Sequence, residues 1–140
     1  MAGPLRKYNI LLVEDNPGDE RLIREAFKAI EGDIAVMSAN SGSEALALLR
    51  RERPDMILLD LNLPGVDGRE VLQELKRDKR LRHIPIVVLT SSLMPGDVLS
   101  AYRAGANCYL QKPVDLTTLF EKIRELFHFW TDTAVLPPAE

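Results

Sequence analysis

The sequence predicts an α/β fold, a doubly wound five-stranded parallel sheet flanked by five helices. Five short apolar runs that suit strands alternate along the chain with five segments whose apolar residues recur at helical spacing. That alternation is typical of βαβ units with right-handed crossovers, which place their strands parallel in one sheet. The run Met56–Leu59 also lacks polar alternation, as expected of a strand that helices cover on both faces.

Length and composition indicate one globular domain. The chain has 140 residues, of which 46% are hydrophobic and 28% charged, a balance that can build a core. A formal net charge of -3, with Lys and Arg scattered among the acids, argues against a basic face for nucleic acid. No nucleic-acid partner is therefore expected.

Cysteine usage and the N-terminal segment bear on the compartment. Cys108 is the one cysteine, so no disulfide can form within the chain, and its side chain is expected to be a small buried hydrophobe. Residues 1–7 lack the long apolar region of a signal peptide, and no run reaches membrane-spanning length. We expect a cytoplasmic protein with no membrane contact.

The five apolar runs are the expected strands. They cover residues 9–13, 34–39, 56–59, 86–89 and 108–111. The fourth is rich in β-branched residues and is bounded by Pro85, which favours a strand over a buried helix. Turn signals follow the third run at once, with Pro64, Gly65 and Gly68.

A capping or starting signal precedes each expected helix. The signals are Asn16 with Pro17, the capping box of Ser41 and Glu44, Asp67 with Glu70, Pro95, and Asp115. The fourth helix is expected to use Val98, Leu99 and Tyr102 as its core face and to stop at Gly105 in a left-handed conformation. The apolar stripe of the fifth runs from Leu116 to Trp130 at helical spacing.

Two segments read as connections or tails. Residues 77–83 are rich in charge and are expected to be exposed, with His83 a surface residue. The segment 131–140 contains Pro137 and Pro138, which rule out continued helix, and is expected to be extended or mobile. The domain is therefore expected to span residues 1–130, followed by a C-terminal tail.

Side chains that can do chemistry stand at the ends of four expected strands. They are Glu14 with Asp15, Asp60, Thr90 and Lys112. Because parallel strands end at one edge, these groups would share a cleft. Three carboxylates held this close repel one another by about 4 kcal/mol per pair at contact near a protein surface, so the cluster needs a cation. Oxygen ligands with no nearby histidine or thiolate match Mg²⁺.

A divalent ion, a lysine and a hydroxyl around one reactive carboxylate are the parts that hold a phosphoryl group and disperse its charge. Asp60 can be the nucleophile and form an aspartyl phosphate. Asp15 and Asp60 would then contact the metal, while Lys112 and Thr90 would contact the phosphoryl oxygens.

These residues carry a resemblance to a known family. The chain resembles a response-regulator receiver domain of a two-component system from Tyr8 to about Trp130. The matching motifs are the acidic pair Glu14 and Asp15, the segment Asp60, Leu63, Pro64, Asp67 and Gly68, the hydroxyl of Thr90, and Lys112 with Pro113. The acidic pair is Glu-Asp where the family most often has Asp-Asp.

The resemblance implies a CheY-like fold with strand order 2-1-3-4-5 and a Mg²⁺ site. Asp15, Asp60 and the backbone carbonyl of Asn62 would hold the ion, and Glu14 would act through water. The protein would be a phosphoacceptor switch and not an enzyme with a small-molecule substrate. It would accept its phosphoryl group from a sensor histidine kinase or a small donor, and would dephosphorylate itself.

The resemblance also implies how the switch works. The peptide bond before Pro113 would be cis and would aim Lys112 at the site. Thr90 would move toward the phosphoryl group and Tyr109 would change rotamer, which transmits the state of Asp60 to the face made by the fourth helix, fifth strand and fifth helix.

A closer resemblance is to the stand-alone response regulators of bacterial phytochrome histidine kinases. It is carried by four segments, namely Asn16 to Asp19, Asp67 to Leu72, Ala106 to Tyr109, and Phe129 with Trp130 followed by Leu136 and Pro137. A phytochrome kinase is therefore an expected partner.

Three other functions compete with the receiver interpretation. A haloacid-dehalogenase-type phosphatase needs a second Asp two residues after its nucleophile, where this chain has Asn62. A flavodoxin-like FMN module would place its phosphate against Glu14 and Asp15, which repel it. A phosphorylation-independent adaptor is disfavoured because the acceptor motifs are complete.

The C-terminal region has more apolar surface than the last turn of a monomer requires. Phe127, Phe129 and Trp130 stand at the helix end, with Val135 and Leu136 beyond. Either the tail folds back on its own domain or it forms a homodimer contact, and we favour the dimer, built from the fourth helix, fifth strand, fifth helix and tail.

Overall fold

A computed structural model describes residues 6–138 of the chain, in which strands and helices alternate as predicted. The strands are β1 (Lys7–Val13), β2 (Asp33–Ala39), β3 (Met56–Leu59), β4 (Ile86–Thr90) and β5 (Cys108–Gln111). The helices are α1 (Pro17–Lys28), α2 (Gly42–Leu49), α3 (Gly68–Arg77), α4 (Pro95–Arg103) and α5 (Leu116–His128), and a π-helix, η1 (Phe129–Thr133), extends α5.

The five strands form one parallel sheet in the order β2-β1-β3-β4-β5, which confirms the predicted fold class and strand order. The register pairs Val13 with Leu59, and Leu59 with Val88. β1 and β3 therefore end at one level and β4 runs two residues further, so the residues that follow these strands meet at that edge.

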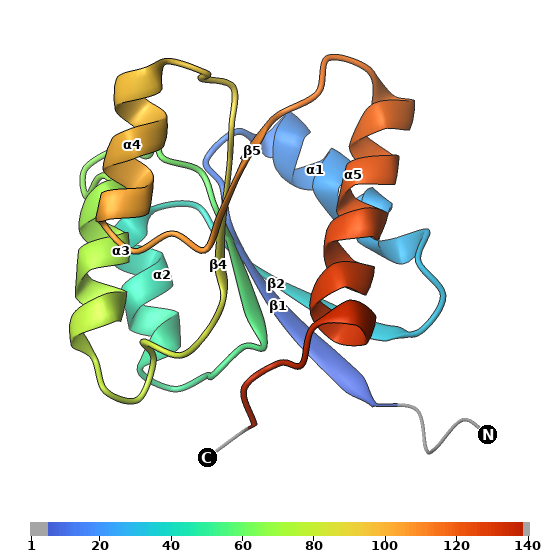
Figure 1. Cartoon of the computed structure of the whole chain (residues 1–140), viewed down its shortest axis with the longest axis horizontal. Helices are drawn as coiled ribbons and strands as arrows, with labels where there is room; N and C mark the ends of the chain where they lie inside the picture. The colour runs from blue at the N-terminus through green and yellow to red at the C-terminus, as the bar shows by residue number, and fades with distance from the viewer. Residues whose placement is uncertain (1–5, 139–140) are drawn as a thin grey trace.

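Helices cover both faces of the sheet (Figure 1). The helices α2, α3 and α4 lie on one face, and α1 and α5 lie on the other. Successive residues of β3 alternate between the two layers, since Ile57 and Leu59 join one core cluster while Met56 and Leu58 join the other. All four are fully buried, which explains why this strand shows no polar alternation in sequence.

The predicted capping side chains open four of the five α-helices. Asn16, Ser41, Asp67 and Asp115 each accept a hydrogen bond from a backbone N–H of the helix that follows. Only α4 lacks a side-chain cap, because Met94 occupies that position. These caps fix where α1 and α3 leave the sheet edge, and therefore how the residues near that edge are aimed.

The predicted core face of α4 is wrong. Leu99 and Tyr102 are 49% and 47% exposed, and the one buried residue of the helix is Ala101. The helix carries apolar residues on two adjacent faces, so helical periodicity cannot tell which of them meets the sheet. The larger side chains form an apolar outer surface instead.

The segment after α3 is partly buried, which differs from the exposed connection we predicted. His83 is exposed as expected, but Leu81 is 5% exposed and packs with the core cluster under α3. Charged residues outnumber Leu81 in this segment, and a single apolar residue among them gives no periodic signal.

The C-terminal tail packs partly on its own domain. Residues 131–133, which we expected to be non-helical, belong to η1, because the two prolines stand too far along the chain to end the helix at Trp130. After η1 the chain is extended, and Leu136 is buried while Val135 is 93% exposed. Ala139 and Glu140, the last residues of the predicted tail, lie outside the described residues, as does segment 1–5. No helix within residues 6–138 is long and apolar enough to cross a membrane.

Gly68 provides a test of how tightly α3 packs on the loop after β3. A Cβ at this position would lie 2.6 Å from the carbonyl oxygen of Asp60 and 2.7 Å from the Cα of Leu61, and backbone cannot move aside cheaply. We expect Gly68→Ala to lower the free energy of unfolding by about 1–3 kcal/mol in urea titrations.

The matched control is Gly96→Ala on α4, where a Cβ would have no atom within 4 Å. It should leave stability unchanged or raise it by up to about 1 kcal/mol, because alanine favours a helix over glycine. Equal stability of the two variants would contradict the close packing at Gly68.

Candidate functional site

Backbone hydrogen bonds continue the sheet past the strand ends and fix the residues predicted to form the site. The N–H of Glu14 donates to Ala39 at 2.9 Å, and that of Asp60 donates to Val13 at 3.0 Å. The N–H of Lys112 donates to the carbonyl of Thr90 at 2.8 Å. The first residue after each of β1, β3 and β5 is thus hydrogen-bonded to the neighbouring strand as if it were still part of its own strand. The Cα atoms of Glu14, Asp60 and Lys112 are therefore fixed at one edge of the sheet.

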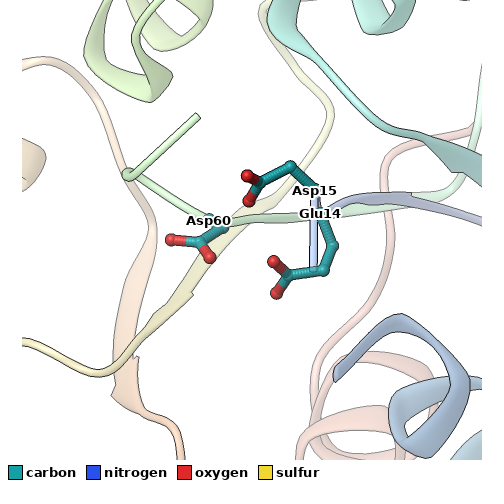
Figure 2. Close-up of side chains that lie close together, drawn as sticks. All are labelled: Glu14, Asp15 and Asp60. Atoms are coloured by element: carbon teal, nitrogen blue, oxygen red, sulfur yellow. The ribbon is translucent and has the colours of Figure 1, made fainter. Parts of the chain in front are cut away.

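Three carboxylates meet at this edge (Figure 2). Glu14 and Asp60 are buried, at 2% and 6% exposure, and Asp15 is exposed. One oxygen atom from each lies within 4.8 Å of the others, and Figure 2 shows the side chains pointing into a common space. The structure therefore brings together the acidic residues that the sequence suggested as metal ligands.

Lys112 lies in the middle of this charge. Its ammonium is 2.6 Å from Glu14 Oε1, 2.8 Å from Asp60 Oδ2 and 2.9 Å from Asp19 Oδ2. A lysine has three N–H donors, so each can serve one carboxylate. The ion pairs are largely shielded from solvent on the lysine side, since that side chain is 16% exposed.

Asp19 is the site residue that sequence reasoning missed. Sequence reasoning assigned it no role in the site, because an acid in the first turn of α1 is already accounted for by a favourable interaction with the helix dipole. The signal that could have identified Asp19 as a site residue was its position in the chain, because α1 begins directly at the sheet edge that carries Glu14 and Asp15. Whether the side chain turns toward the lysine or toward solvent depends on packing that the sequence does not display.

The site holds more negative than positive charge, and this excess influences the pKa values of Glu14 and Lys112. Burial, helped by the charge of Asp60, raises the pKa of Glu14 to about 7, although Lys112 opposes the rise. Burial would lower the pKa of Lys112, but its hydrogen bonds to Asp60, Glu14 and Asp19 outweigh this and raise it. The lysine therefore stays charged, and the excess negative charge is relieved at Glu14.

Thr90 and Asn62 complete the polar lining around Asp60. Thr90 is fully buried, and its hydroxyl accepts a hydrogen bond of 3.4 Å from the side-chain amide of Asn62. The backbone N–H of Asn62 donates to Asp60 Oδ1 at 3.0 Å. The loop after β3 thus folds back over the carboxylate, while the predicted role of the Asn62 carbonyl as a metal ligand stays a prediction.

The predicted cis peptide before Pro113 is wrong for this structure. All peptide bonds within residues 6–138 are trans, including the one between Lys112 and Pro113. Trans is the lower-energy isomer at X–Pro bonds. Lys112 reaches all three of its carboxylate partners from the trans geometry, so the aim of its side chain does not require the cis isomer.

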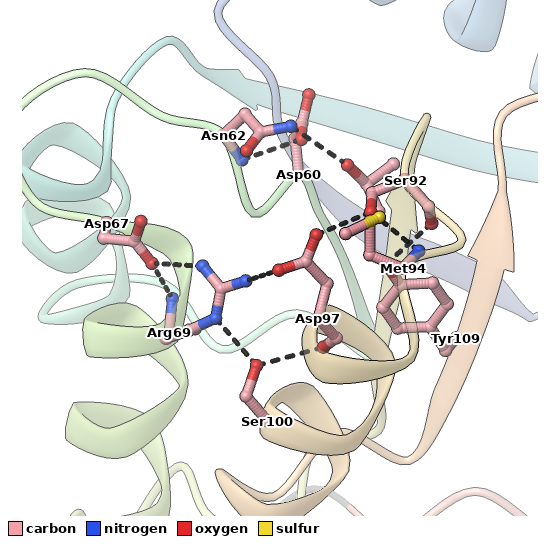
Figure 3. Close-up of polar contacts among 10 residues, drawn as sticks. Asp60, Asn62, Asp67, Arg69, Ser92, Met94, Asp97, Ser100 and Tyr109 are labelled. Atoms are coloured by element: carbon pink, nitrogen blue, oxygen red, sulfur yellow. Dashed lines mark hydrogen bonds and ion pairs between the residues drawn. The ribbon is translucent and has the colours of Figure 1, made fainter.

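Tyr109 connects β5 to the loop that follows Thr90 (Figure 3). Its half-buried hydroxyl donates to the carbonyl of Ser92 at 2.8 Å, and burial raises the pKa of the phenol. The hydroxyl of Ser92 donates to Asp97 at 2.5 Å, and Asp97 pairs with Arg69 at 2.7 Å. This chain of contacts ties the loop to both α4 and α3, and of its members sequence reasoning had given a role in the switch only to Tyr109.

The geometry suits a divalent cation and an anionic group bound together. Carboxylate oxygens are the ligands that Mg²⁺ and Mn²⁺ prefer, and three of them converge within metal-binding reach. Lys112 and Thr90 stand beside Asp60 as a positive charge and a hydroxyl that could meet the oxygens of a phosphoryl group.

Comparison with known proteins agrees with this chemistry. Residues 10–124 match the family described as the response regulator receiver domain. The chain is 43% identical over 137 residues to the response regulator Rcp1 of Synechocystis sp. PCC 6803, an alignment that covers 93% of each protein.

Solved structures share the fold closely. The phosphorylated cyanobacterial phytochrome response regulator RcpA matches with a TM-score of 0.90 and 44% identity, over 95% of this chain and 100% of that one. The Mn²⁺-bound form of Rcp1 matches with a TM-score of 0.86 and 42% identity, over 94% and 99%.

A third match holds magnesium. The receiver domain of the sensor histidine kinase PA1611 from Pseudomonas aeruginosa PAO1, which has a magnesium ion coordinated in its active-site cleft, aligns at 32% identity with a TM-score of 0.73. The alignment covers 86% of this chain and 97% of that one. The cluster of Glu14, Asp15 and Asp60 can accordingly bind a divalent metal ion.

Metal binding should depend on pH because Glu14 must lose its proton to add its negative charge to the metal cluster. With a pKa of about 7, Glu14 is mostly protonated near pH 6 and mostly ionised near pH 8. We expect the dissociation constant for Mg²⁺ to be about tenfold higher near pH 6 than near pH 8, as measured by the rise in melting temperature with Mg²⁺.

Glu14→Gln should flatten this dependence, whereas Glu31→Gln, an exposed acid beside the opposite end of β2, should keep it. Equal Mg²⁺ affinity of the unmodified chain at both pH values would contradict the raised pKa of Glu14.

Proposed function

The chain belongs to the response regulator receiver domain family, and from that premise we propose that Asp60 is its phosphoacceptor. Phosphoryl acceptance is implied by the family. The observation that supports Asp60 in particular is its place at the end of buried β3, with the ammonium of Lys112 2.8 Å from one carboxylate oxygen. No other acid of the cluster combines burial with contacts to both Lys112 and the Asn62 backbone.

The proposed reaction is transfer from a phosphohistidine of a sensor kinase. A carboxylate oxygen of Asp60 attacks the phosphorus, the P–N bond breaks, and its electron pair returns to the imidazole. Lys112 and Thr90 would face the phosphoryl oxygens. Asp15, Asp60 and the Asn62 carbonyl would hold Mg²⁺, with Glu14 acting through water, and the bound ion would offset the negative charge that gathers during transfer.

The chain's own chemistry is proposed to end with the aspartyl phosphate and its hydrolysis. A phosphatase of the haloacid-dehalogenase type needs a second acid near its nucleophile, and the residue that folds over Asp60 here is Asn62, an amide. Transfer to the chain from a kinase or a small phosphodonor, followed by self-dephosphorylation, requires no further catalytic group.

Thr90 and Tyr109 are proposed to carry the phosphorylated state to the surface. A phosphoryl group on Asp60 would offer the Thr90 hydroxyl a charged acceptor for its proton, whereas in the present contact of 3.4 Å that hydroxyl only accepts from the Asn62 amide. Movement of Thr90 would displace the loop that holds the Tyr109 hydroxyl at Ser92, and the tyrosine would change rotamer. The contacts from Ser92 through Asp97 to Arg69 would pass this shift to α4.

The kinase partner is proposed to be a phytochrome. The support is the similarity to RcpA, described as a cyanobacterial phytochrome response regulator, over 95% of this chain. We propose the cytoplasm as the compartment, where the half-buried thiol of Cys108 would stay reduced.

A homodimer is proposed through α4, β5, α5 and the tail. Leu99, Tyr102 and Phe129 are each about half exposed, and Val135 is almost fully exposed. A groove of about 480 Å³ lies on α5 and β5, lined in part by Leu110, Leu126 and Trp130. These apolar groups lie on α4, β5, α5, η1 and the tail, and a second copy of the chain would cover them.

If Asp60 is the phosphoacceptor, replacing it should prevent phosphorylation of the chain. Asp60→Asn should abolish labelling by a cognate histidine kinase, or by a small phosphodonor with Mg²⁺, because the amide is a poor nucleophile for phosphorus. Phos-tag gels or intact mass would measure the label. Asp33→Asn, at the exposed start of β2, is the matched control and should label normally. Persistent labelling of Asp60→Asn at the unmodified level would remove the assignment.

The dimer predicts a change in solution mass. Leu99→Asp would bury a charge in the contact and should weaken self-association at least about tenfold in sedimentation equilibrium. Ala47→Asp, which adds the same charge at an exposed position of α2, a helix outside this surface, should not. Removal of residues 134–140 should act in the same direction as Leu99→Asp, while Trp130 stays to pack on the core. A mass that is unchanged in both variants would exclude this surface.

A further inference from the structure

We propose that Asp19 acts on the phosphoacceptor site through Lys112: it partly neutralises the charge of the lysine and so limits phosphorylation by strongly anionic donors. The inference rests on the proposed role of Asp60. Asp19 belongs to the segment Asn16 to Asp19, which the acceptor chemistry described above leaves without a function. Its carboxylate is 2.9 Å from the Lys112 ammonium, at nearly the same distance as Asp60.

The start of α1 aims Asp19 at the lysine. Pro17 opens the helix, and the Asn16 side chain accepts a hydrogen bond from the Asp19 N–H at 3.0 Å. This cap holds the first turn against the end of β5. A small hollow of about 40 Å³ there is lined by Asp19, Lys112 and Pro113 together with apolar residues of α1 and α5. Asp19 is thereby held beside Lys112 by the backbone of α1.

Asp19 is not part of the metal cluster. The group of acids with oxygens within 4.8 Å of one another, among the described residues, is Glu14, Asp15 and Asp60. The side chain of Asp19 is 39% exposed, whereas those of Glu14 and Asp60 are almost completely buried. Asp19 therefore lies on the solvent side of the lysine and acts on the site through Lys112 and through its own charge.

Two effects of Asp19 on the reaction oppose each other, and the contacts decide between them. Losing Asp19 would remove one of three restraints on the lysine, but Glu14 and Asp60 would still hold it at 2.6 and 2.8 Å from positions that the sheet fixes. Losing Asp19 would also remove a negative charge that contacts Lys112, and the positive charge of Lys112 is what a phosphoryl group needs. Because Glu14 and Asp60 still hold Lys112 in place, losing the charge of Asp19 affects the reaction more than losing its restraint on the lysine.

The consequence is discrimination by donor charge. In Asp19→Asn the full charge of Lys112 faces the incoming donor, and an anion meets one carboxylate fewer. Acetyl phosphate is a dianion near neutral pH and phosphoramidate carries less negative charge. The substitution should therefore accelerate phosphorylation by acetyl phosphate more than by phosphoramidate.

The experiment compares the two donors at saturating Mg²⁺, with intact mass following the phosphorylation of Asp60. An oxygen of Asp60 attacks the phosphorus, and acetate or ammonia leaves with the electron pair of the broken bond. We expect Asp19→Asn to raise the rate constant for acetyl phosphate about threefold to tenfold, the scale of a screened charge near the surface, and the rate for phosphoramidate by less. The ratio of the two rates is the readout, since a change in stability alone would move both together.

Two further variants complete the test. Glu20→Gln removes the same charge from the same helical turn, but Glu20 pairs with Arg24 and not with Lys112, so it should leave the donor ratio unchanged. Asp19→Glu restores the charge and should restore the ratio.

A donor ratio in Asp19→Asn equal to that of the unmodified chain would overturn the inference while Asp60 still accepts the phosphoryl group. Loss of Asp60 labelling in the unmodified chain would instead overturn the proposed function, so the two failures are distinguishable.

Discussion

Repulsion among acids that a parallel sheet forces together is the constraint on which this site depends. The backbone ladder extends to Glu14 and Asp60, so the Cα atoms that carry these carboxylates cannot separate without breaking main-chain hydrogen bonds. They are buried, and burial strengthens both their repulsion and their attraction for a cation. Lys112 supplies one positive charge against three carboxylates in contact with it, and the raised pKa of Glu14 reflects the shortfall. A divalent cation offsets more of this charge than the lysine can alone.

The same constraint explains why the neighbourhood of Asp60 can respond to a phosphoryl group. Thr90 is fully buried yet has only a long contact with the Asn62 amide, and Tyr109 is held to the same loop through Ser92. Asp97 and Arg69 continue these contacts onto α4 and α3 (Figure 3). New charge at Asp60 would thus act on a connected set of polar groups, while the two apolar layers on either side of the sheet stay packed.

The fold and the acidic cluster could be predicted because their signals are local. Apolar runs such as Met56–Leu59 identify the strands, and the polar residue that follows each run identifies the edge. The contact of Asp19 with Lys112 could not be predicted from the sequence, because the two residues are far apart in the chain. A carboxylate in a first helical turn is also already explained by its interaction with the helix dipole. The exposed face of α4 and the burial of Leu136 depend on which surfaces the rest of the chain leaves free. The trans bond before Pro113 departs from what the family resemblance implied, and nothing in the local sequence selects between the isomers.

The central claim is that one carboxylate among several neighbours, Asp60, receives the phosphoryl group. Reduction of the phosphorylated chain with borohydride tests it directly, since hydride converts an acyl phosphate to an alcohol and leaves free carboxylates intact. Peptide mass mapping should then find homoserine in place of Asp60, with Asp15 and Asp19 unchanged. A reduced residue at Glu14 or Asp15, with Asp60 intact, would contradict the account.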